Sequence, residues 1–228
     1  MTLCIPQILN LRQLEQFRAQ LEGAGAPWVD GRATAGYQGA SVKHNRQLDE
    51  TSALARQLGG AVLAELERNA LFISAALPQR VYPPLFNSYE AGMSFGSHVN
   101  GAIRRLPGLG QALRTDLSAT LFLVAPEEYE GGELVLEGPG GVQRFKLPAG
   151  DMVLYPTSAR HHVTAVTRGR RLACFFWIQS LVRQVVQREQ LFDLDSAIQR
   201  LNATGADPDS MVRLVGVYHN LLRAWSEP

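Results

Sequence analysis

The 228-residue sequence has little of what would assign it to a specialised class of protein. Two cysteines, Cys4 and Cys174, are too few for the disulfide framework of a small secreted domain. A formal net charge of +1 argues against a dedicated nucleic-acid binder. No apolar run approaches the ~20 residues of a membrane span, and the N-terminus lacks the pattern of a signal peptide. These absences predict a cytoplasmic, reduced protein without nucleic-acid or membrane partners.

The spacing of apolar residues changes twice along the chain. It is helical near the N-terminus, where Asn10 is a suitable N-cap, and again over about 50–69. From about residue 80, short apolar runs alternate with turns rich in glycine and proline, which predicts an antiparallel sandwich or barrel. Helical spacing then returns. We therefore predict a mainly β protein with flanking helices, divided into an N-terminal helical support region over 1–79, a β core over 80–180 and a C-terminal helical domain over 181–228.

The last predicted helix has an apolar stripe that needs a packing partner. Asp207-Pro208 is a typical helix start, because proline fits the first turn of a helix. Apolar residues then recur along one face as far as Trp225. This face should pack on the β core or on a second copy of the chain, so a homodimer through the C-terminal helices is one expected arrangement.

Three of the five histidines lie in the predicted β region: His98, His161 and His162. A non-haem Fe(II) site needs two imidazoles and one carboxylate on one face of the metal. His-x-Asp at a strand end supplies two of these ligands, because alternate strand residues point to the same side. Here the pair is His98 and Asn100, with an amide in place of the acid. The distant ligand would be His161 or His162, of which only one should point inward.

The other two histidines, His44 and His219, are interpreted as surface or satisfied core residues. Arg171 opens the last strand of the β region, where its guanidinium could hold a carboxylate through two parallel hydrogen bonds. Ser118 and Thr120 alternate with apolar residues and would suit the lining of a polar cavity.

Several alternatives stay open at this point. Asn100-Gly101 is also a strong signal for a β-hairpin turn. Glu133 could serve as a substitute acid for iron, although it is better interpreted as a residue at a strand start. A group of arginines near the expected site would either steer an anionic substrate or simply solvate a loop: Arg104, Arg105 and Arg114.

Seven segments carry a resemblance to a known family. They are APWVDGRATAG (26–36), NALFISAALP (69–78), PPLFNSYEAGMSFGSHV (83–99), RTDLSATLFL (114–123), YEGGELVLE (129–137), KLPAGDMVLYPTSARHHVTAVTRGRR (146–171) and VYHNLLRAW (217–225). On these the chain resembles a bacterial PKHD-type hydroxylase of the iron-uptake-factor group, within the Fe(II)/2-oxoglutarate-dependent dioxygenases. The matched segments cover almost the whole chain and are specific to the family but not to a substrate.

The resemblance implies a fold, cofactors and roles for particular residues. The fold would be a double-stranded β-helix of the jelly-roll type. His98 and His161 would be iron ligands, His161 being favoured because the family motif reads Tyr-Pro, four residues, then the ligand. Arg171 would bind the distal carboxylate of 2-oxoglutarate, and Tyr89 would help to hold this cosubstrate. Ascorbate would keep the iron reduced, and O2 and an unidentified small molecule or protein would be the other reactants.

The chain departs from the family pattern at residue 100, where the family has aspartate and this chain has Asn100. Asparagine keeps an oxygen acceptor but loses the negative charge that Fe(II) prefers. Either Asn100 completes the iron site through its oxygen, or the chain is a catalytically impaired binding or regulatory module, or it is a variant of an active enzyme. A halide-binding vacancy is excluded because asparagine leaves no room for it. Because glycine follows it, Asn100 is also prone to deamidation, which would regenerate an acid there.

Overall fold

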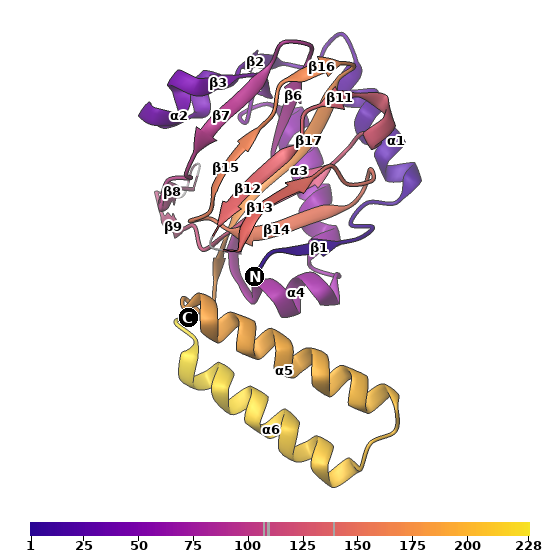
Figure 1. Cartoon of the computed structure of the whole chain (residues 1–228), viewed down its shortest axis with the longest axis vertical. Coiled ribbons are helices and arrows are strands. Elements are labelled where there is room, and N and C mark those ends of the chain that lie inside the picture. Colours follow the sequence, from indigo (N-terminus) through magenta and orange to yellow (C-terminus); the bar gives the residue numbers. More distant parts are fainter. Residues whose placement is uncertain (107, 109, 139) are drawn as a thin grey trace.

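Two antiparallel sheets face each other and form the body of the molecule (Figure 1). The computed structural model describes residues 1–106, 108, 110–138 and 140–228. One cluster of buried side chains joins the sheets, with Tyr89 and Tyr155 from the larger and Leu134 and Val163 from the smaller. The jelly-roll fold predicted from the sequence is therefore confirmed.

The larger sheet has eight strands, seven of which follow one path. Its centre is a long strand whose apolar sequence leaves most of its residues buried, as expected for a strand that is covered on both faces. In spatial order the strands are β1 (Leu3–Ile5), β14 (Met152–Pro156), β10 (Leu117–Phe122), β17 (Arg171–Ser180), β6 (Leu85–Tyr89), β4 (Arg46–Leu48) and β2 (Trp28–Asp30), with β5 (Pro78–Val81) beside β17.

The smaller sheet has five strands and lies across the core from the larger one. In spatial order they are β13 (Gly141–Phe145), β12 (Leu134–Gly138), β15 (Arg160–Val163), β7 (Ser94–His98) and β3 (Lys43–His44). Two further strand pairs are β11 (Glu130–Gly131) with β16 (Val166–Arg168), and β8 (Ile103–Arg105) with β9 (Ala112–Arg114).

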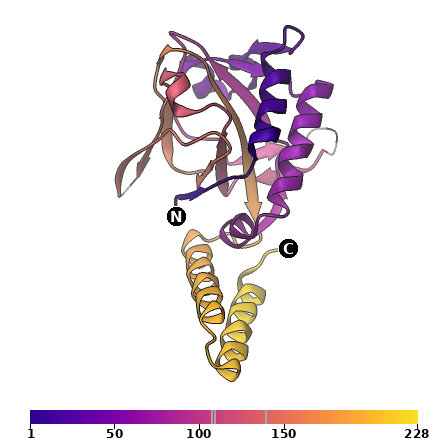
Figure 2. The same ribbon diagram turned by 90° about the vertical axis from the view of Figure 1, so that its right-hand side faces the viewer.

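Helices cover the outer face of the larger sheet (Figure 2). Phe17 of the first helix meets Phe86 of β6, with ring centres 6.2 Å apart. Asn10 caps that helix as predicted, since its side chain accepts from the Gln13 N–H and its own N–H donates back to the Gln13 side chain. The helices before β17 are α1 (Leu11–Glu22), α2 (Tyr37–Val42), α3 (Ala53–Leu66) and α4 (Ala70–Ala76), with short 3-10 turns η1 (Gly31–Thr34) and η2 (Pro126–Glu128).

The expectation of a helical region over 1–79 was incomplete. Its helices form, but β1 to β4 also come from this region and pair with strands of both sheets. Each of these strands has two or three residues, too few for an alternating pattern to stand out in the sequence. The division of the chain at residues 80 and 181 stays a prediction.

The last two helices, α5 (Val185–Ala203) and α6 (Pro208–Trp225), form a hairpin that projects away from the sheets (Figures 1 and 2). A small apolar cluster at its base joins it to the body, with Leu77, Val182 and Leu191 buried and Trp225 packed against them. In the part of the chain that the structure describes, no helix is long and apolar enough to cross a membrane.

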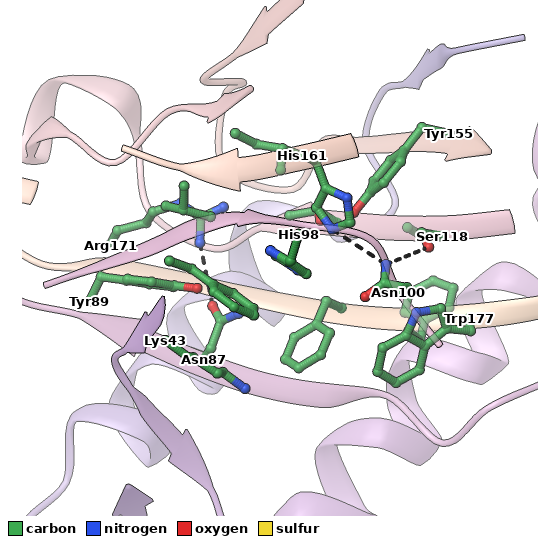
Figure 3. Close-up of a pocket in the computed structure, with 17 residues that line it drawn as sticks. Lys43, Asn87, Tyr89, His98, Asn100, Ser118, Tyr155, His161, Arg171 and Trp177 are labelled. Atoms are coloured by element: carbon green, nitrogen blue, oxygen red, sulfur yellow. Dashed lines mark hydrogen bonds between the residues drawn. The ribbon is translucent and has the colours of Figure 1, made fainter. Parts of the chain in front are cut away.

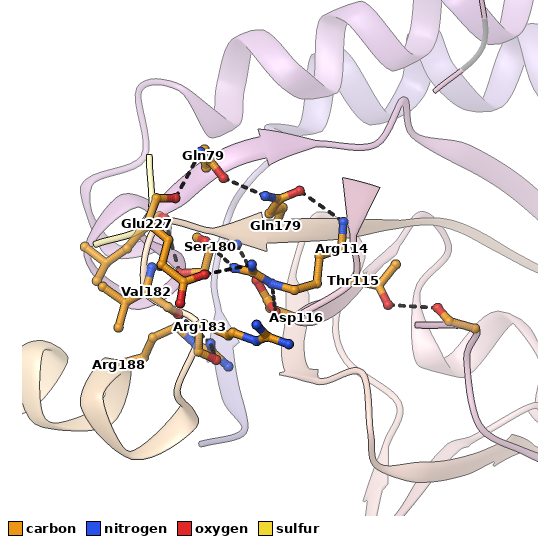
Figure 4. A network of polar contacts seen from close by, with 12 residues as sticks. Gln79, Arg114, Thr115, Asp116, Gln179, Ser180, Val182, Arg183, Arg188 and Glu227 are labelled. Carbon is orange, nitrogen blue, oxygen red and sulfur yellow. Dashed lines mark hydrogen bonds and ion pairs between the residues drawn. The ribbon is translucent and has the colours of Figure 1, made fainter. Parts of the chain in front are cut away.

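A polar network also holds the hairpin base against the β core (Figure 4). Asp116, which precedes β10, accepts from the Ser180 N–H at 2.9 Å and from Arg114 Nε at 2.8 Å. Arg114 also pairs with Glu227 near the C-terminus at 3.1 Å. Arg114 is thus held by two carboxylates, so of the three arginines considered above this one has a structural role.

We expect Asp116→Ala to destabilise the fold, because it leaves the Ser180 N–H and the Nε–H of Arg114 without their acceptor. Loss of hydrogen bonds that involve a charged group should lower the free energy of unfolding by about 1.5–3 kcal/mol in urea denaturation. Asp193→Ala, at an exposed position of α5, is the control. Equal stability of the two variants would contradict this role for Asp116.

Candidate active site

His98 and His161 lie side by side in the cavity between the sheets (Figure 3). They are directly opposed in the antiparallel pairing of β7 with β15, so their side chains leave the same face. Their ring centres are 4.2 Å apart, and the two residues are 7% and 5% exposed. The pairing of two distant segments therefore brings together the two histidines that the sequence singled out.

Each of these imidazoles is fixed through its Nδ1 atom. Nδ1 of His98 lies 2.8 Å from the Gly96 carbonyl and Nδ1 of His161 lies 2.9 Å from the Ala159 carbonyl. A carbonyl oxygen only accepts, so Nδ1 carries the proton and Nε2 keeps its lone pair. Burial, then the neighbouring His161, lowers the pKa of His98 to about 4, and burial lowers the pKa of His161. Both rings are thus neutral at neutral pH.

The structure distinguishes His161 from its neighbour His162. His162 lies on the other side of β15, with Nδ1 3.5 Å from a carboxylate oxygen of Glu137. The prediction that only one of the two points inward is confirmed. His44 and His219 are exposed, so of the two interpretations given for them the surface one holds. The hairpin expected as an alternative at Asn100-Gly101 is absent from the described pairings of β7, because this strand pairs with β15 and β3 while β8 pairs with β9.

Asn100 lies beside the histidine pair, two residues beyond the last residue of β7 (Figure 3). Its Nδ2 donates to Ser118 Oγ at 3.2 Å and faces Nε2 of His161 at 3.4 Å. Rotation of the amide by a half turn would exchange Nδ2 with Oδ1 and direct an oxygen at the same place. The side chain is therefore positioned as a third ligand would be, but without a negative charge.

No other acid replaces this charge among the residues described. They contain no group of three or more His, Cys, Asp or Glu side chains arranged to hold a metal ion. Glu133, the alternative from the sequence, is paired with Arg144 at 2.8 Å, and its own N–H donates to Thr164. The site thus offers two imidazoles and one amide.

Arg171 lies deeper in the same cavity and is only 1% exposed. Its NH1 group reaches Asn87 Oδ1 at 3.4 Å, its Nε has no hydrogen-bond partner, and within the described residues no carboxylate forms an ion pair with it. A buried cation without a counter-ion is costly unless a ligand supplies the charge. Gly132 permits this placement, because a Cβ there would lie 3.0 Å from Arg171 Cδ.

Tyr89 adjoins this arginine. The two residues are opposed in the pairing of β17 with β6, and the guanidinium carbon is 5.3 Å from the centre of the tyrosine ring. Complete burial raises the pKa of Tyr89 to about 12, so its hydroxyl stays protonated and able to donate. Ser118 and Thr120 line the cavity, as the alternation along β10 predicted.

Comparison with known proteins identifies the family of this chain. The pattern of the 2OG-Fe(II) oxygenase superfamily matches residues 84–179, and that of the PKHD-type hydroxylase C-terminal domain matches residues 186–227. A PKHD-type hydroxylase of Burkholderia ambifaria is 64% identical over 98% of both chains, and one of Paraburkholderia xenovorans is 62% identical over 100% of both. The chain belongs to the PKHD-type hydroxylases.

Solved structures agree on the fold. A prolyl-4-hydroxylase of Pseudomonas putida is similar with a TM-score of 0.53 and 18% identity, covering 78% of this chain and 92% of its own. A prolyl hydroxylase of Trichoplax adhaerens, solved with a peptide fragment of hypoxia inducible factor, is similar with a TM-score of 0.55 and 14% identity, covering 78% of this chain and 82% of its own. At such identities the likeness establishes the jelly-roll fold and no more.

Lys43 is a residue of the site that the sequence analysis missed. It lies on β3 beside the exposed His44, is 5% exposed, and lines the cavity with its ammonium 5.3 Å from the centre of the Phe95 ring. Its Nζ donates to Gln47 at 3.0 Å. The polar stretch KHNR resembles a surface loop, and alternation across a two-residue strand would have been its only signal.

Burial, reinforced by the positive charge of Arg104, lowers the pKa of Lys43 to about 8. The unfolded chain, with a lysine pKa of about 10.4, binds more protons than the folded chain between pH 8 and 10. The destabilisation that results from burying the charged Lys43 ammonium is therefore fully present below pH 8, and it decreases as the pH rises and the ammonium loses its proton. Relative to Lys43→Met, we expect the parent's free energy of unfolding to rise by about 1–2 kcal/mol over this interval in urea denaturation.

The parent and Lys43→Met contain the same tyrosines, which also ionise over this pH interval. The difference between their free energies of unfolding therefore does not include tyrosine ionisation. Lys146→Met also removes one lysine, from a position outside the cavity, and is the control for the loss of a lysine. Parallel curves for the parent and Lys43→Met would contradict a depressed pKa at Lys43.

Asn100 should also deamidate readily. Asn100 and Gly101 lie outside the strands, Gly101 is exposed, and no atom lies within 4 Å of where its Cβ would be. The Gly101 nitrogen attacks Asn100 Cγ with loss of ammonia, and water then opens the succinimide to aspartate or isoaspartate. Peptide mapping of aged protein should find this change first at residue 100, and more slowly in Gly101→Ala. A residue 100 that stays fully amidated would exclude this chemistry.

Proposed function

We propose that the chain is an Fe(II)- and 2-oxoglutarate-dependent hydroxylase whose iron site is weakened by Asn100. The observation that carries this proposal is the placement of two fixed, neutral imidazoles beside a buried guanidinium that has no carboxylate partner among the described residues. Two imidazoles suit Fe(II), and the guanidinium suits a carboxylate of the cosubstrate. Both groups therefore fit the site.

His98 and His161 would hold the metal through their Nε2 atoms, since hydrogen bonds to backbone carbonyls hold both rings in the required tautomer. Asn100 would supply the third ligand through Oδ1, after its amide turns away from the contact with Ser118. With a neutral third ligand, the positive charge of the metal is less well balanced than in a site with a carboxylate. We expect weaker iron binding as a result.

Arg171 would bind the distal carboxylate of 2-oxoglutarate, and the Tyr89 hydroxyl would donate a further hydrogen bond to the cosubstrate. The aromatic residues Phe95, Tyr155 and Phe175 also line this cavity and would help to keep bulk water away from these groups. When bound, Fe(II) and 2-oxoglutarate supply the oxidation, in which O2 and 2-oxoglutarate are converted with the substrate to succinate, CO2 and a hydroxylated product.

A second candidate is a catalytically impaired binding or regulatory module. One observation favours it. Nδ2 of Asn100 lies 3.4 Å from Nε2 of His161, so the amide occupies the direction of the lone pair that a metal would need. In that case the Arg171 end of the cavity would still bind a dicarboxylate.

Iron titration beside an Asn100→Asp variant separates the two candidates. Because even a lost partner of a metal ligand costs about 10–100-fold in affinity or activity, the variant should bind Fe(II) at least about tenfold more tightly than the parent. If the parent also binds iron and converts 2-oxoglutarate to succinate, it is a hydroxylase. If only the variant does so, the parent is an impaired module. Failure of both to bind iron would refute the assignment of the iron site.

Binding of 2-oxoglutarate is tested separately by calorimetry. Arg171→Gln should lose binding by a factor of about ten or more, as expected for charge-assisted hydrogen bonds. Arg170→Gln is the matched control, because Arg170 donates to Ser88 Oγ, stacks near Trp28 and does not line the cavity. Equal losses in both variants would contradict the role of Arg171.

Other properties implied by the resemblance or the composition stay proposals. They are a cytoplasmic location, a link to iron uptake, the use of ascorbate to keep the iron reduced, a small-molecule or protein substrate, and the absence of nucleic-acid and membrane partners. We also propose a homodimer through α5 and α6, which is supported by exposed apolar residues along α6: Val212, Val215 and Val217.

A further inference from the structure

The cavity continues outward from the histidine pair into a second compartment of about 240 Å³. Both compartments share Lys43, Phe95, His98, Asn100, Phe175 and Trp177, whereas Arg171 and Tyr89 line only the inner one. If the inner compartment holds 2-oxoglutarate, as the proposed function requires, the outer compartment offers a substrate a route to His98 and Asn100. The chemistry of the outer compartment should therefore match the substrate.

Arg104 is the distinctive residue of the outer compartment. It lies on β8, and its guanidinium carbon is 3.9 Å from the centre of the Trp177 ring and 5.9 Å from that of Tyr82. Trp177 is 3% exposed and is held by edge contacts with Tyr82 at 5.5 Å and with Phe175 at 5.6 Å. The aromatic group thus holds the guanidinium over the Trp177 ring.

Arg104 forms no direct ion pair in the described part of the chain, where Glu50 acts on its charge only from beyond ion-pair distance and burial lowers the pKa of its guanidinium. No hydrogen bond or ion pair to its side chain is formed there, in contrast to Arg114 on the paired strand β9, which Asp116 and Glu227 neutralise. None of the described residues that line the outer compartment is Asp or Glu. Stacking occupies one face of the guanidinium and leaves the N–H groups at its edge available.

We propose that the outer compartment selects substrates that carry a carboxylate, which the edge of the Arg104 guanidinium binds, with a flat or apolar part of the substrate against Trp177 and Phe175. Arg104 is then a specificity-determining residue that anchors one end of the substrate near His98. This proposal rests on the proposed function for the identity of the occupant, but its binding chemistry is tested without turnover.

Three probes of equal size test the charge preference: benzoate, benzamide and benzylamine, which carry negative, no and positive charge. Each is titrated into the full chain in the presence of saturating 2-oxoglutarate, and the Trp177 indole resonance is followed by NMR after assignment with Trp177→Phe. Benzoate should bind at least about tenfold more tightly than either other probe, as a charge-assisted pair requires.

Variants of two neighbouring arginines make the test specific. Arg104→Gln should weaken benzoate binding about tenfold or more and abolish the preference, and Arg104→Lys should retain part of it. Arg105→Gln is the matched control, because Arg105 is the next residue on β8 and is exposed, so this variant should match the parent. Equal binding of benzoate and benzamide, no response to benzoate, or an unchanged preference in Arg104→Gln would overturn the proposal.

The outcomes also distinguish this proposal from the proposed function. Calorimetry of 2-oxoglutarate alone reports on the Arg171 end of the cavity. If 2-oxoglutarate binds but the benzoate preference is absent, only the substrate proposal fails. If 2-oxoglutarate does not bind but benzoate still binds in an Arg104-dependent way, the hydroxylase function fails while the anion site stands.

Discussion

The antiparallel register between β7 and β15 places His98 directly opposite His161, and the rest of the cavity is arranged around that pair. A shift of this register by one residue would turn one of the imidazoles to the outer face, because strand side chains alternate. The cross-strand pair fixes where the rings are, and the carbonyls of Gly96 and Ala159 fix which nitrogen is free. Position and tautomer thus both follow from the backbone.

Charge is the second constraint on the cavity. Lys43 and Arg171 bring positive charge to its lining, and Arg104 adds more at its outer end, whereas the described lining residues include no Asp or Glu. Such a cavity is costly without ligands and favours anionic ones. In this setting the change from a carboxylate to an amide at residue 100 removes the one acid that the family pattern places beside the metal. The change therefore favours anionic ligands and weakens the binding of a divalent cation.

Much of the site could be predicted from the sequence, because the residues that form it occur in local sequence patterns. His98 and Asn100 are two residues apart at a strand end, His161 precedes a residue that faces outward, and Arg171 begins a strand. The C-terminal helices were accessible for the same reason, since α6 has a proline start and a regular apolar stripe. Such features depend on neighbours in the chain.

The parts that escaped prediction depend on tertiary contacts. The strands β1 to β4 are too short to show alternation, so the contribution of residues 1–48 to both sheets could not be recognised. Lys43 was missed for that reason. The roles of Arg104 and Arg114 were left open because both depend on contacts with residues that are distant in the sequence. Only the structure shows Arg114 between two carboxylates and the Arg104 guanidinium over the Trp177 ring.

In the proposed metal site of this chain, the free Nε2 atoms of His98 and His161 bind the ion. With only five histidines, ¹⁵N NMR of histidine-labelled protein can follow each ring during a titration with Zn²⁺ as a diamagnetic substitute for iron. We predict that the Nε2 signals of His98 and His161 shift together while their Nδ1 atoms stay protonated. Unchanged Nε2 signals of this pair, or shifts confined to His44, His162 or His219, would contradict the claim.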